Sequence, residues 1–359
     1  MTGNRHAGEQ PQRVPWVRQM REIALALSIA ATGSVGVGGA WMPTVLAATC
    51  EIPAADFGDA GPVTDEPAQS ESTPAVGAAI IQVEGEDIAA ATPIAVRPAA
   101  TPLAATPVLA APDPVVLLAQ ELTAVSEALA ACLSAGDSET VAELAGERYL
   151  GQLFGGSVPL AKDEYIAIAE QVTPVSTRIV ALDTVAQPSD DRATAIVTQV
   201  VGNQLVQAEW SFEQVASAER REGESAWRLS GERQQPVTAP ADAAIVDVAI
   251  GERSFTLAET TVDGPDVVLR GSNRADEDHE MLVLRLAPGY TTADLLRASG
   301  PDLPEDVTFI GAATVRAGDE NELVLVDLDP GEYTIVCFFP DEQGTPHLAQ
   351  GMEATFSVG

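Results

Sequence analysis

The chain has 359 residues, of which 46% are hydrophobic, and a formal net charge of −34 at pH 7. This length predicts about two domains with additional segments, and the apolar content is sufficient for folded cores. The negative charge repels phosphate backbones and anionic lipid surfaces, so it argues against nucleic-acid binding and favours a partner protein with a basic face.

Residues 1–48 have the pattern of an export signal. Four arginines precede or enter an apolar run from Ile23 to Ala48, which ends in the small residues LAAT. Several glycines and Pro43 interrupt this run, which favours a cleaved signal peptide over a retained membrane anchor. We therefore predict a secreted or envelope-associated protein, with anchoring as the alternative. Lipidation of Cys50 is a further alternative, although LAATC fits a bacterial lipobox poorly.

Residues 49–113 are rich in Pro, Ala and Thr, with the related stretches TPIAV, TPLAA and TPVLA. No hydrophobic period is sustained here, and the prolines favour extended backbone. The composition predicts a disordered linker, within which residues 76–83 (VGAAIIQV) are the one stretch suited to pairing as a strand.

Residues 114–238 are predicted to form an α+β domain. Leucines and a valine recur at helical spacing over residues 114–135, Gly136 closes that helix, and Asp137 can cap a second one over residues 138–150. A third helix is predicted over residues 161–172. Long strand-like runs follow, and the middle one turns at Gly202–Asn203, which is a hairpin signal.

The order of helices followed by a meander of long strands resembles the nuclear transport factor 2-like fold. That resemblance implies a cone-like domain with a pocket, and hence a small apolar ligand, but no particular activity. The domain contains no histidine. The polar candidates in this domain are Asp163, Glu164, Tyr165 and Asp183. Each occupies a position suited to a solvated helix face or a turn, so we predict that none of them is catalytic. Cys132 is predicted to be a small buried residue, and a disulfide bond between Cys132 and Cys50 is an alternative that the sequence does not decide.

Residues 240–359 change to short β-type runs separated by turn signals such as DGP, PGY and DPGE. Regularly spaced short strands of this kind predict an all-β sandwich. One insertion, TTADLLRASG, reads as a short helix.

The residues suited to soft-metal chemistry gather in this last segment. Cys337 ends a strand that begins with GEY, His347 follows ten positions later, and Met352 comes five positions after that. His279 lies upstream at the entrance of another strand. A thiolate with two imidazoles forms the trigonal set that copper prefers, and a thioether supplies a weak axial ligand that tunes the potential.

This pattern resembles the cupredoxins, the blue-copper family of plastocyanin and azurin. The strand with Gly331 and Tyr333, followed by Cys337, His347 and Met352, carries the resemblance over about 115 residues, with His279 as the upstream histidine. It implies a Greek-key sandwich in which one copper ion is bound by all four of these side chains.

Two features depart from the family pattern. The loop between the cysteine and the second histidine carries an acidic insert, PDEQG, and is closer in length to that of copper nitrite reductases. Glu280 stands where azurins have an asparagine that braces the cysteine loop. Both departures are expected to affect the copper geometry or potential.

The sequence as a whole therefore predicts a multidomain protein, an α+β cone-like domain followed by an all-β cupredoxin sandwich. A trinuclear copper centre would need several more histidines, so we predict a non-enzymatic, exported, one-copper electron carrier whose redox partner is unknown. The alternative is a ligand-binding or structural surface protein whose cupredoxin-like domain binds copper without electron transfer, or binds no metal.

Overall fold

The computed structural model describes residue 50 and residues 113–216, 225–298 and 303–359. The predicted signal peptide, the predicted strand at residues 76–83 and the linker apart from its two ends lie outside the described residues. Residues 113–359 belong to one compact unit. The division of this unit into domains at residues 238–240 stays a prediction.

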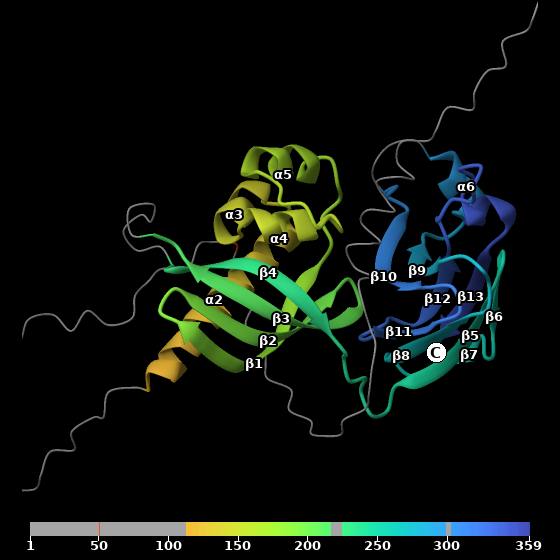
Figure 1. Ribbon diagram of the computed structural model, residues 1–359. Coiled ribbons are helices and arrows are strands. Elements are labelled where there is room, and N and C mark those ends of the chain that lie inside the picture. The colour runs from red at the N-terminus through yellow and green to blue at the C-terminus, as the bar shows by residue number, and fades with distance from the viewer. Residues whose placement is uncertain (1–49, 51–112, 217–224, 299–302) are drawn as a thin grey trace, which may run out of the picture. The chain divides into compact units, whose positions relative to one another are not determined.

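In the first part of the chain, between residues 113 and 238, the residues that the structure describes form four helices and four strands (Figure 1). In chain order these are α2 (Pro114–Ala135), α3 (Ser138–Leu144), α4 (Glu147–Gln152), α5 (Lys162–Ala169), β1 (Thr177–Ser189), β2 (Arg192–Val201), β3 (Gln204–Gln214) and β4 (Trp227–Gln235).

Helix α2 begins and ends at the residues that its local chemistry favours. The Asp113 side chain accepts a hydrogen bond from the backbone N–H of Val115, Pro114 occupies the first turn, and Gly136 ends the helix with φ of 72°. The helix is long and apolar enough for a membrane span, but 44% of its apolar window is buried inside the protein. Its buried stripe, which includes Leu122 and Leu129, instead belongs to the core of this part.

The second predicted helix, over residues 138–150, is broken into α3 and α4. The break lies at Ala145, which adopts extended backbone and forms a β-bridge with Leu229, while Gly146 donates to the carbonyl oxygen of Leu229. Pairing with strand β4 therefore replaces a helical turn at this point.

The strands β1 to β4 form a continuous antiparallel meander. Strand β2 turns into β3 at Gly202–Asn203, as predicted, and Gly202 has φ of 62°, which glycine adopts without strain. One face of the meander buries Trp210, Phe212 and Leu229 against the helices.

In the second part, the described residues form nine strands and two short helices. They are β5 (Ala244–Gly251), β6 (Ser254–Leu257), β7 (Thr261–Val262), β8 (Val267–Asn273), β9 (His279–Leu286), α6 (Thr292–Arg297), β10 (Val307–Val315), β11 (Glu320–Leu325), β12 (Gly331–Val336), η1 (His347–Gln350) and β13 (Glu353–Val358).

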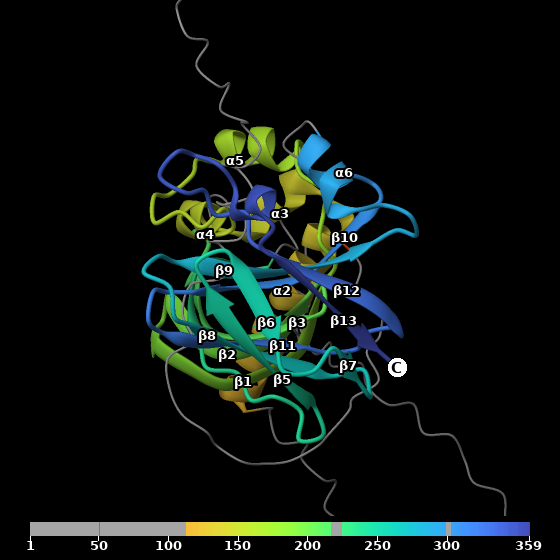
Figure 2. The ribbon, with the colours of Figure 1, turned by 90° about the vertical axis from the view of Figure 1, so that its right-hand side faces the viewer.

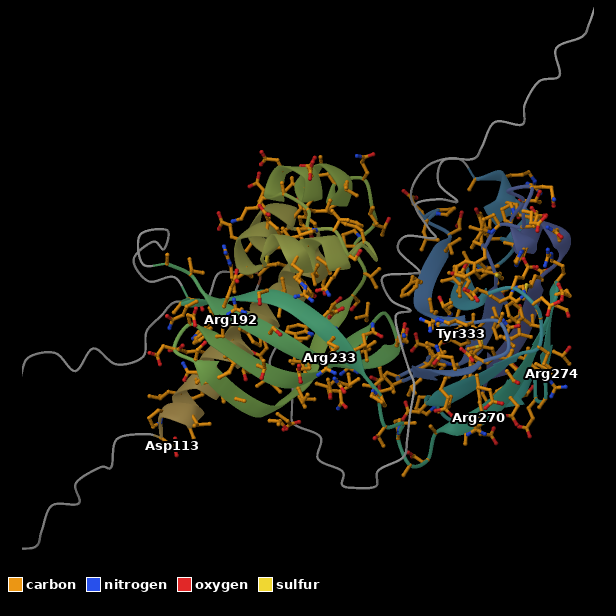
Figure 3. All side chains as sticks on the ribbon, in the orientation of Figure 1. Asp113, Arg192, Arg233, Arg270, Arg274 and Tyr333 are labelled. Atoms are coloured by element: carbon orange, nitrogen blue, oxygen red, sulfur yellow. A yellow bond between two sulfur atoms is a disulfide. The ribbon has the colours of Figure 1, made fainter. Side chains whose placement is uncertain are left out.

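These strands form two facing layers, as the sequence pattern predicts for a sandwich (Figures 1 and 2). One layer has the order β11-β8-β5-β6, and the other has the order β10-β9-β12-β13-β7. Apolar side chains from both layers fill the space between them, including Tyr333, which is labelled in Figure 3 and stacks on Phe356 with ring centroids 5.4 Å apart. The predicted short helix is α6.

The two parts share hydrogen bonds at the β2–β3 turn. Asn203 donates from its backbone to the carbonyl oxygen of Ile310 over 2.8 Å, and its side-chain amide donates to the carbonyl oxygens of Val326 and Asp327. Strand β3 also pairs with β11 through Gln204 and Leu325. The meander and one layer of the sandwich therefore belong to the same hydrogen-bonded sheet.

Candidate metal centre

The sandwich brings the predicted ligands together because their strands are neighbours in one layer. His279 is the first residue of β9, and Cys337 directly follows β12, which pairs with β9 through Val336 and Leu282. His347 begins the helix η1, and Met352 lies directly before β13, the other neighbour of β12. All four side chains are fully buried.

Three ligand atoms form a compact triangle. The Cys337 Sγ lies 3.8 Å from Nδ1 of His279 and 3.5 Å from Nδ1 of His347, and the two Nδ1 atoms are 3.0 Å apart. An ion at the centre of this triangle would lie about 2 Å from each atom, close to the length of a bond between a first-row metal ion and an imidazole nitrogen. The three residues thus form a potential metal-binding group.

The protonation equilibria of these groups also suit a metal. Burial lowers the pKa of His279 to about 4, with His347 as the second cause, and burial likewise lowers the pKa of His347. Both imidazoles are therefore neutral near pH 7 and ready to act as ligands. Burial raises the pKa of the Cys337 thiol, so that the buried thiolate requires a compensating cation.

Met352 is fully buried, and its backbone is hydrogen-bonded to two of the residues that form this triangle. The backbone N–H of Met352 donates to the carbonyl oxygen of His347 over 3.1 Å, and the Met352 carbonyl oxygen accepts from the N–H of Cys337 over 3.4 Å. The segment that carries Met352 is therefore tied to both the cysteine and the second histidine.

The acidic insert in the loop between Cys337 and His347 forms a separate turn. It does not change where the two ends of that loop lie. One carboxylate oxygen of Asp341 accepts hydrogen bonds from the backbone N–H groups of Gln343 and Thr345, and the other accepts from the side chain of Gln350. Beyond the turn, His347 donates to the Phe339 carbonyl oxygen over 3.0 Å. The longer loop thus still returns His347 to the cysteine.

Glu280 braces the cysteine loop from β9. Its Oε1 accepts a hydrogen bond from the backbone N–H of Phe338, the residue after the cysteine, over 2.8 Å. The glutamate therefore supplies the contact for which the azurin resemblance implies an asparagine, and it does so with a carboxyl group that is fully buried.

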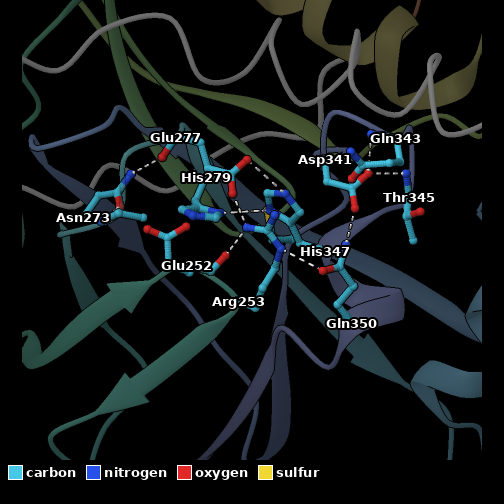
Figure 4. A network of polar contacts seen from close by, with 12 residues as sticks. Glu252, Arg253, Asn273, Glu277, His279, Asp341, Gln343, Thr345, His347 and Gln350 are labelled. Carbon is cyan, nitrogen blue, oxygen red and sulfur yellow. Dashed lines mark hydrogen bonds and ion pairs between the residues drawn. The ribbon is translucent and has the colours of Figure 1, made fainter.

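The outer side of the histidine pair is covered by polar residues that the sequence pattern does not reveal (Figure 4). Nε2 of His347 lies 3.6 Å from a carboxylate oxygen of Glu277, and Glu277 is paired with Arg253 from the β5–β6 turn. Arg253 also donates to the side chain of Gln350 over 2.8 Å. Glu277 lies two positions before His279 in an acidic run, whereas Arg253 has no local signal because only the fold brings it to the site.

A second sulfur cluster lies in the first part of the chain. Cys50 and Cys132 form a disulfide across 82 positions, which settles the pairing that the sequence leaves open and excludes lipidation of Cys50 in this form of the chain. Asp137 lies beside them, but a disulfide has no thiolate to offer a metal, so this cluster is a cross-link.

The four polar candidates of the first part do not converge on a common site. Asp163 and Glu164 are exposed on α5, and Asp183 is in the middle of β1. Tyr165 differs from the expectation of a solvated position, since its side chain is buried in the core between the helices.

No protein-family model matches this chain, and no curated protein matches it. Among solved structures, the chain is similar to a dithionite-reduced auracyanin from the photosynthetic bacterium Roseiflexus castenholzii, with 21% identity and a TM-score of 0.24 over 33% of this chain and 99% of that one. Auracyanin B shows 20% identity and a TM-score of 0.24, with coverage of 34% and 94%. A copper nitrite reductase from Nitrosomonas europaea shows 12% identity and a TM-score of 0.21, with coverage of 43% and 66%.

The cluster of ligand atoms confirms the predicted resemblance to cupredoxins. The similarities to the two auracyanin structures are consistent with that resemblance. The copper assignment depends on the geometry of the ligand atoms. The resemblance of residues 114–238 to the nuclear transport factor 2-like fold stays a prediction.

Proposed function

We propose that this protein is an exported blue-copper protein that carries single electrons, with one copper ion bound by His279, Cys337, His347 and Met352. The observation that carries the proposal is the convergence of one thiol sulfur and two imidazole nitrogens within 3.8 Å of one another in a fully buried site. Thiolate and imidazole ligands together suit copper in both of its common oxidation states.

When bound, copper supplies reversible one-electron exchange, and the chain supplies a frame that keeps the ligands in place. Cys337 and His279 lie at the ends of adjacent strands, and the Glu280–Phe338 hydrogen bond holds the backbone after the cysteine. A frame of paired strands limits ligand movement, which in turn limits the rearrangement that accompanies electron transfer.

Two observations support export. The N-terminal segment has the composition of a signal peptide, and Cys50 is disulfide-bonded to Cys132. Disulfides form and persist mainly in oxidising compartments outside the cytosol. We further propose that residues 114–238 adopt the nuclear transport factor 2-like fold, which their helices and four-stranded meander support.

The histidine count favours electron transfer over copper catalysis. The chain contains three histidines, His6, His279 and His347, and the first lies in the proposed signal peptide. A multicopper oxidase or nitrite reductase activity requires further copper ligands, which this chain does not supply from its own sequence.

The redox partner is proposed to have a basic face. Acidic side chains are exposed in the β5–β6 turn, directly before β9 and in the loop after Cys337, and these are Glu252, Asp276, Asp278 and Glu342. Charges of this kind act mainly on the rate of encounter, so electron exchange should slow as salt is added.

The proposal is tested on the full chain by copper analysis, an optical spectrum and a redox titration. We expect one copper per chain, an intense thiolate-to-copper band in the visible range, and reversible loss of that band on reduction. Cys337→Ser should abolish the band, whereas Met281→Leu, which changes a buried methionine outside the ligand set, should leave it intact.

Two results would contradict parts of this proposal. A band that survives Cys337→Ser would exclude the ligand assignment. Copper binding without reversible reduction, or without electron exchange with a small basic redox protein, would favour the alternative of a copper-binding module without an electron-transfer role.

A further inference from the structure

The first part of the chain contains a cavity of about 180 Å³ that is unrelated to the copper ligands. It lies between the helices and the β meander, and its lining residues come only from positions 132–232. An engineered apolar cavity of about 150 Å³ in another protein takes up benzene, so a cavity of this size can hold one ring.

The walls of the cavity are largely apolar, and polar side chains such as Gln152, Gln199 and Glu232 line it as well. Val141, Phe154 and Val201 contribute apolar surface, while the hydroxyl-bearing side chains of Tyr149 and Tyr165 are buried at its inner side. Exposed residues of the segment after α5, Thr173 and Pro174, lie at its rim. Predominantly apolar walls with a small number of polar groups are typical of small-molecule sites.

One of the polar groups is a carboxyl that a β-bulge turns into the interior. Strand β4 pairs Leu229 with Phe212 but Gly231 with Ser211, so the register shifts at Ser230. The shift places Glu232 opposite the fully buried Trp210, on the inward face of the sheet. Without the bulge the alternation of the strand would direct this carboxyl outward.

The backbone of Glu232 is held in this position by helix α4. The Gln152 side chain donates to the Glu232 carbonyl oxygen over 3.0 Å and accepts from the Glu232 N–H over 2.9 Å. A side-chain amide that satisfies both backbone groups of one strand residue fixes that residue relative to the helix, so the carboxyl is presented to the cavity by a rigid frame.

The carboxyl lacks a cationic partner among the described residues that line the cavity, none of which is Lys, Arg or His. Burial raises the pKa of Glu232 to about 7, while the Trp210 indole N–H opposes that rise. This indole nitrogen approaches the carboxyl but makes no well-formed hydrogen bond among the described residues. Burial raises the pKa of Tyr149, and the Glu232 carboxyl adds to that rise, so these two lining residues lie close enough to interact at the cavity.

We infer that this cavity binds a small amine that carries a single apolar ring, with the ammonium group on the Glu232 carboxylate and the ring against the apolar walls. An organic cation would supply the charge that the lining lacks, and the cavity volume limits the rest of the molecule to about one ring. This inference does not depend on copper, and it replaces the expectation of a purely apolar ligand for this part of the chain.

The test uses benzylamine as the probe with the full chain, measured by calorimetry and by saturation-transfer NMR. Methylamine has the charge without the ring, and benzoate has the ring with the opposite charge. We expect saturable binding of one benzylamine per chain, at least about tenfold tighter than methylamine or benzoate, since a charge-assisted hydrogen bond and ring burial both contribute.

Glu232→Gln is the decisive variant, and Glu143→Gln is its matched control because Glu143 is exposed on α3 and does not line the cavity. Glu232→Gln should weaken benzylamine binding about tenfold or more and Glu143→Gln should not, with the copper band unchanged in both. Equal binding of benzylamine and methylamine, no saturable binding, or unchanged binding by Glu232→Gln would each overturn the inference. Circular dichroism of both variants excludes misfolding as the cause of a loss.

Discussion

The two parts of the chain each contain a cluster of sulfur and potential ligand atoms around a fully buried cysteine, but the two clusters differ in chemistry. In the sandwich, the free thiol of Cys337 faces two imidazole nitrogens. In the α+β part, Cys132 is bonded to Cys50, and the nearby polar group is the carboxylate of Asp137.

The difference shows what a cysteine needs in order to become a metal ligand. Cys337 has no second cysteine within reach among the described residues, so its sulfur remains available as a thiolate. Cys132 meets a partner cysteine from a distant segment and forms a covalent cross-link with it. Burial is the same in both cases, so the neighbouring side chains decide the role of the sulfur.

The largest effect on stability is expected from the cross-link. The double variant Cys50→Ala/Cys132→Ala should lower the free energy of unfolding by about 2–4 kcal/mol, because the loop it closes is long. Denaturant unfolding of the full chain measures the loss. The visible copper band should be unchanged, and a loss of that band would show that the two clusters are coupled.

The next effect concerns Glu232 and depends on pH. Its pKa is raised by burial from 4.5 to about 7, so the native state holds the proton more tightly than the unfolded chain. The contribution of the protonated Glu232 carboxyl to the free energy of unfolding is fully present below pH 4.5 and is lost as the pH rises through about 7.

Relative to Glu232→Gln, the wild-type chain should therefore lose about 2–3 kcal/mol of stability from acidic to mildly alkaline pH. Denaturant unfolding of both proteins at a series of pH values checks this slope, with Glu143→Gln measured in parallel. A difference between wild type and Glu232→Gln that is constant with pH would show that the carboxyl does not titrate in the cavity.

A smaller effect is expected at Glu280 in the sandwich. Glu280→Ala removes the acceptor of the buried Phe338 N–H and should cost about 1–3 kcal/mol. Glu280→Gln retains an acceptor, so its stability should remain close to that of the wild type. A negative charge beside the copper stabilises the oxidised ion more than the reduced ion. Removing that charge should therefore raise the reduction potential, which voltammetry can determine.

The smallest structural effect is expected at the axial position. Met352→Leu should retain the visible band and the stability within about 1.5 kcal/mol, because the volume changes little. Its reduction potential should rise, since the weak thioether donor is lost. Met281→Leu alters another fully buried methionine of the same sandwich and should leave the potential unchanged. Equal potentials in both variants would remove Met352 from the ligand set.

The proposed copper ligands could be predicted from the sequence because their residue types are rare in this chain. Two of the three histidines and the free cysteine lie in one segment, and the order of Cys337, His347 and Met352 is set by local connections between neighbouring strands. The helix end at Gly136, the cap at Asp137 and the turn at Gly202 are equally local, and each has a direct conformational cause.

The remaining features depend on contacts between distant segments. The break of the helix at Ala145 arises from its bridge to Leu229, which no local propensity encodes. Arg253 reaches the proposed copper site through the fold of the β5–β6 turn. Glu232 resembles an ordinary solvated strand residue until the register shift in β4 is known.

The Cys50–Cys132 bond has a consequence for how the polypeptide responds to proteases. Because Cys50 is fastened to the helix that begins at Pro114, the intervening chain is part of a covalent ring. A single nick within residues 51–112 would therefore release no fragment, and the two pieces would migrate together on a gel until a thiol reagent separates them.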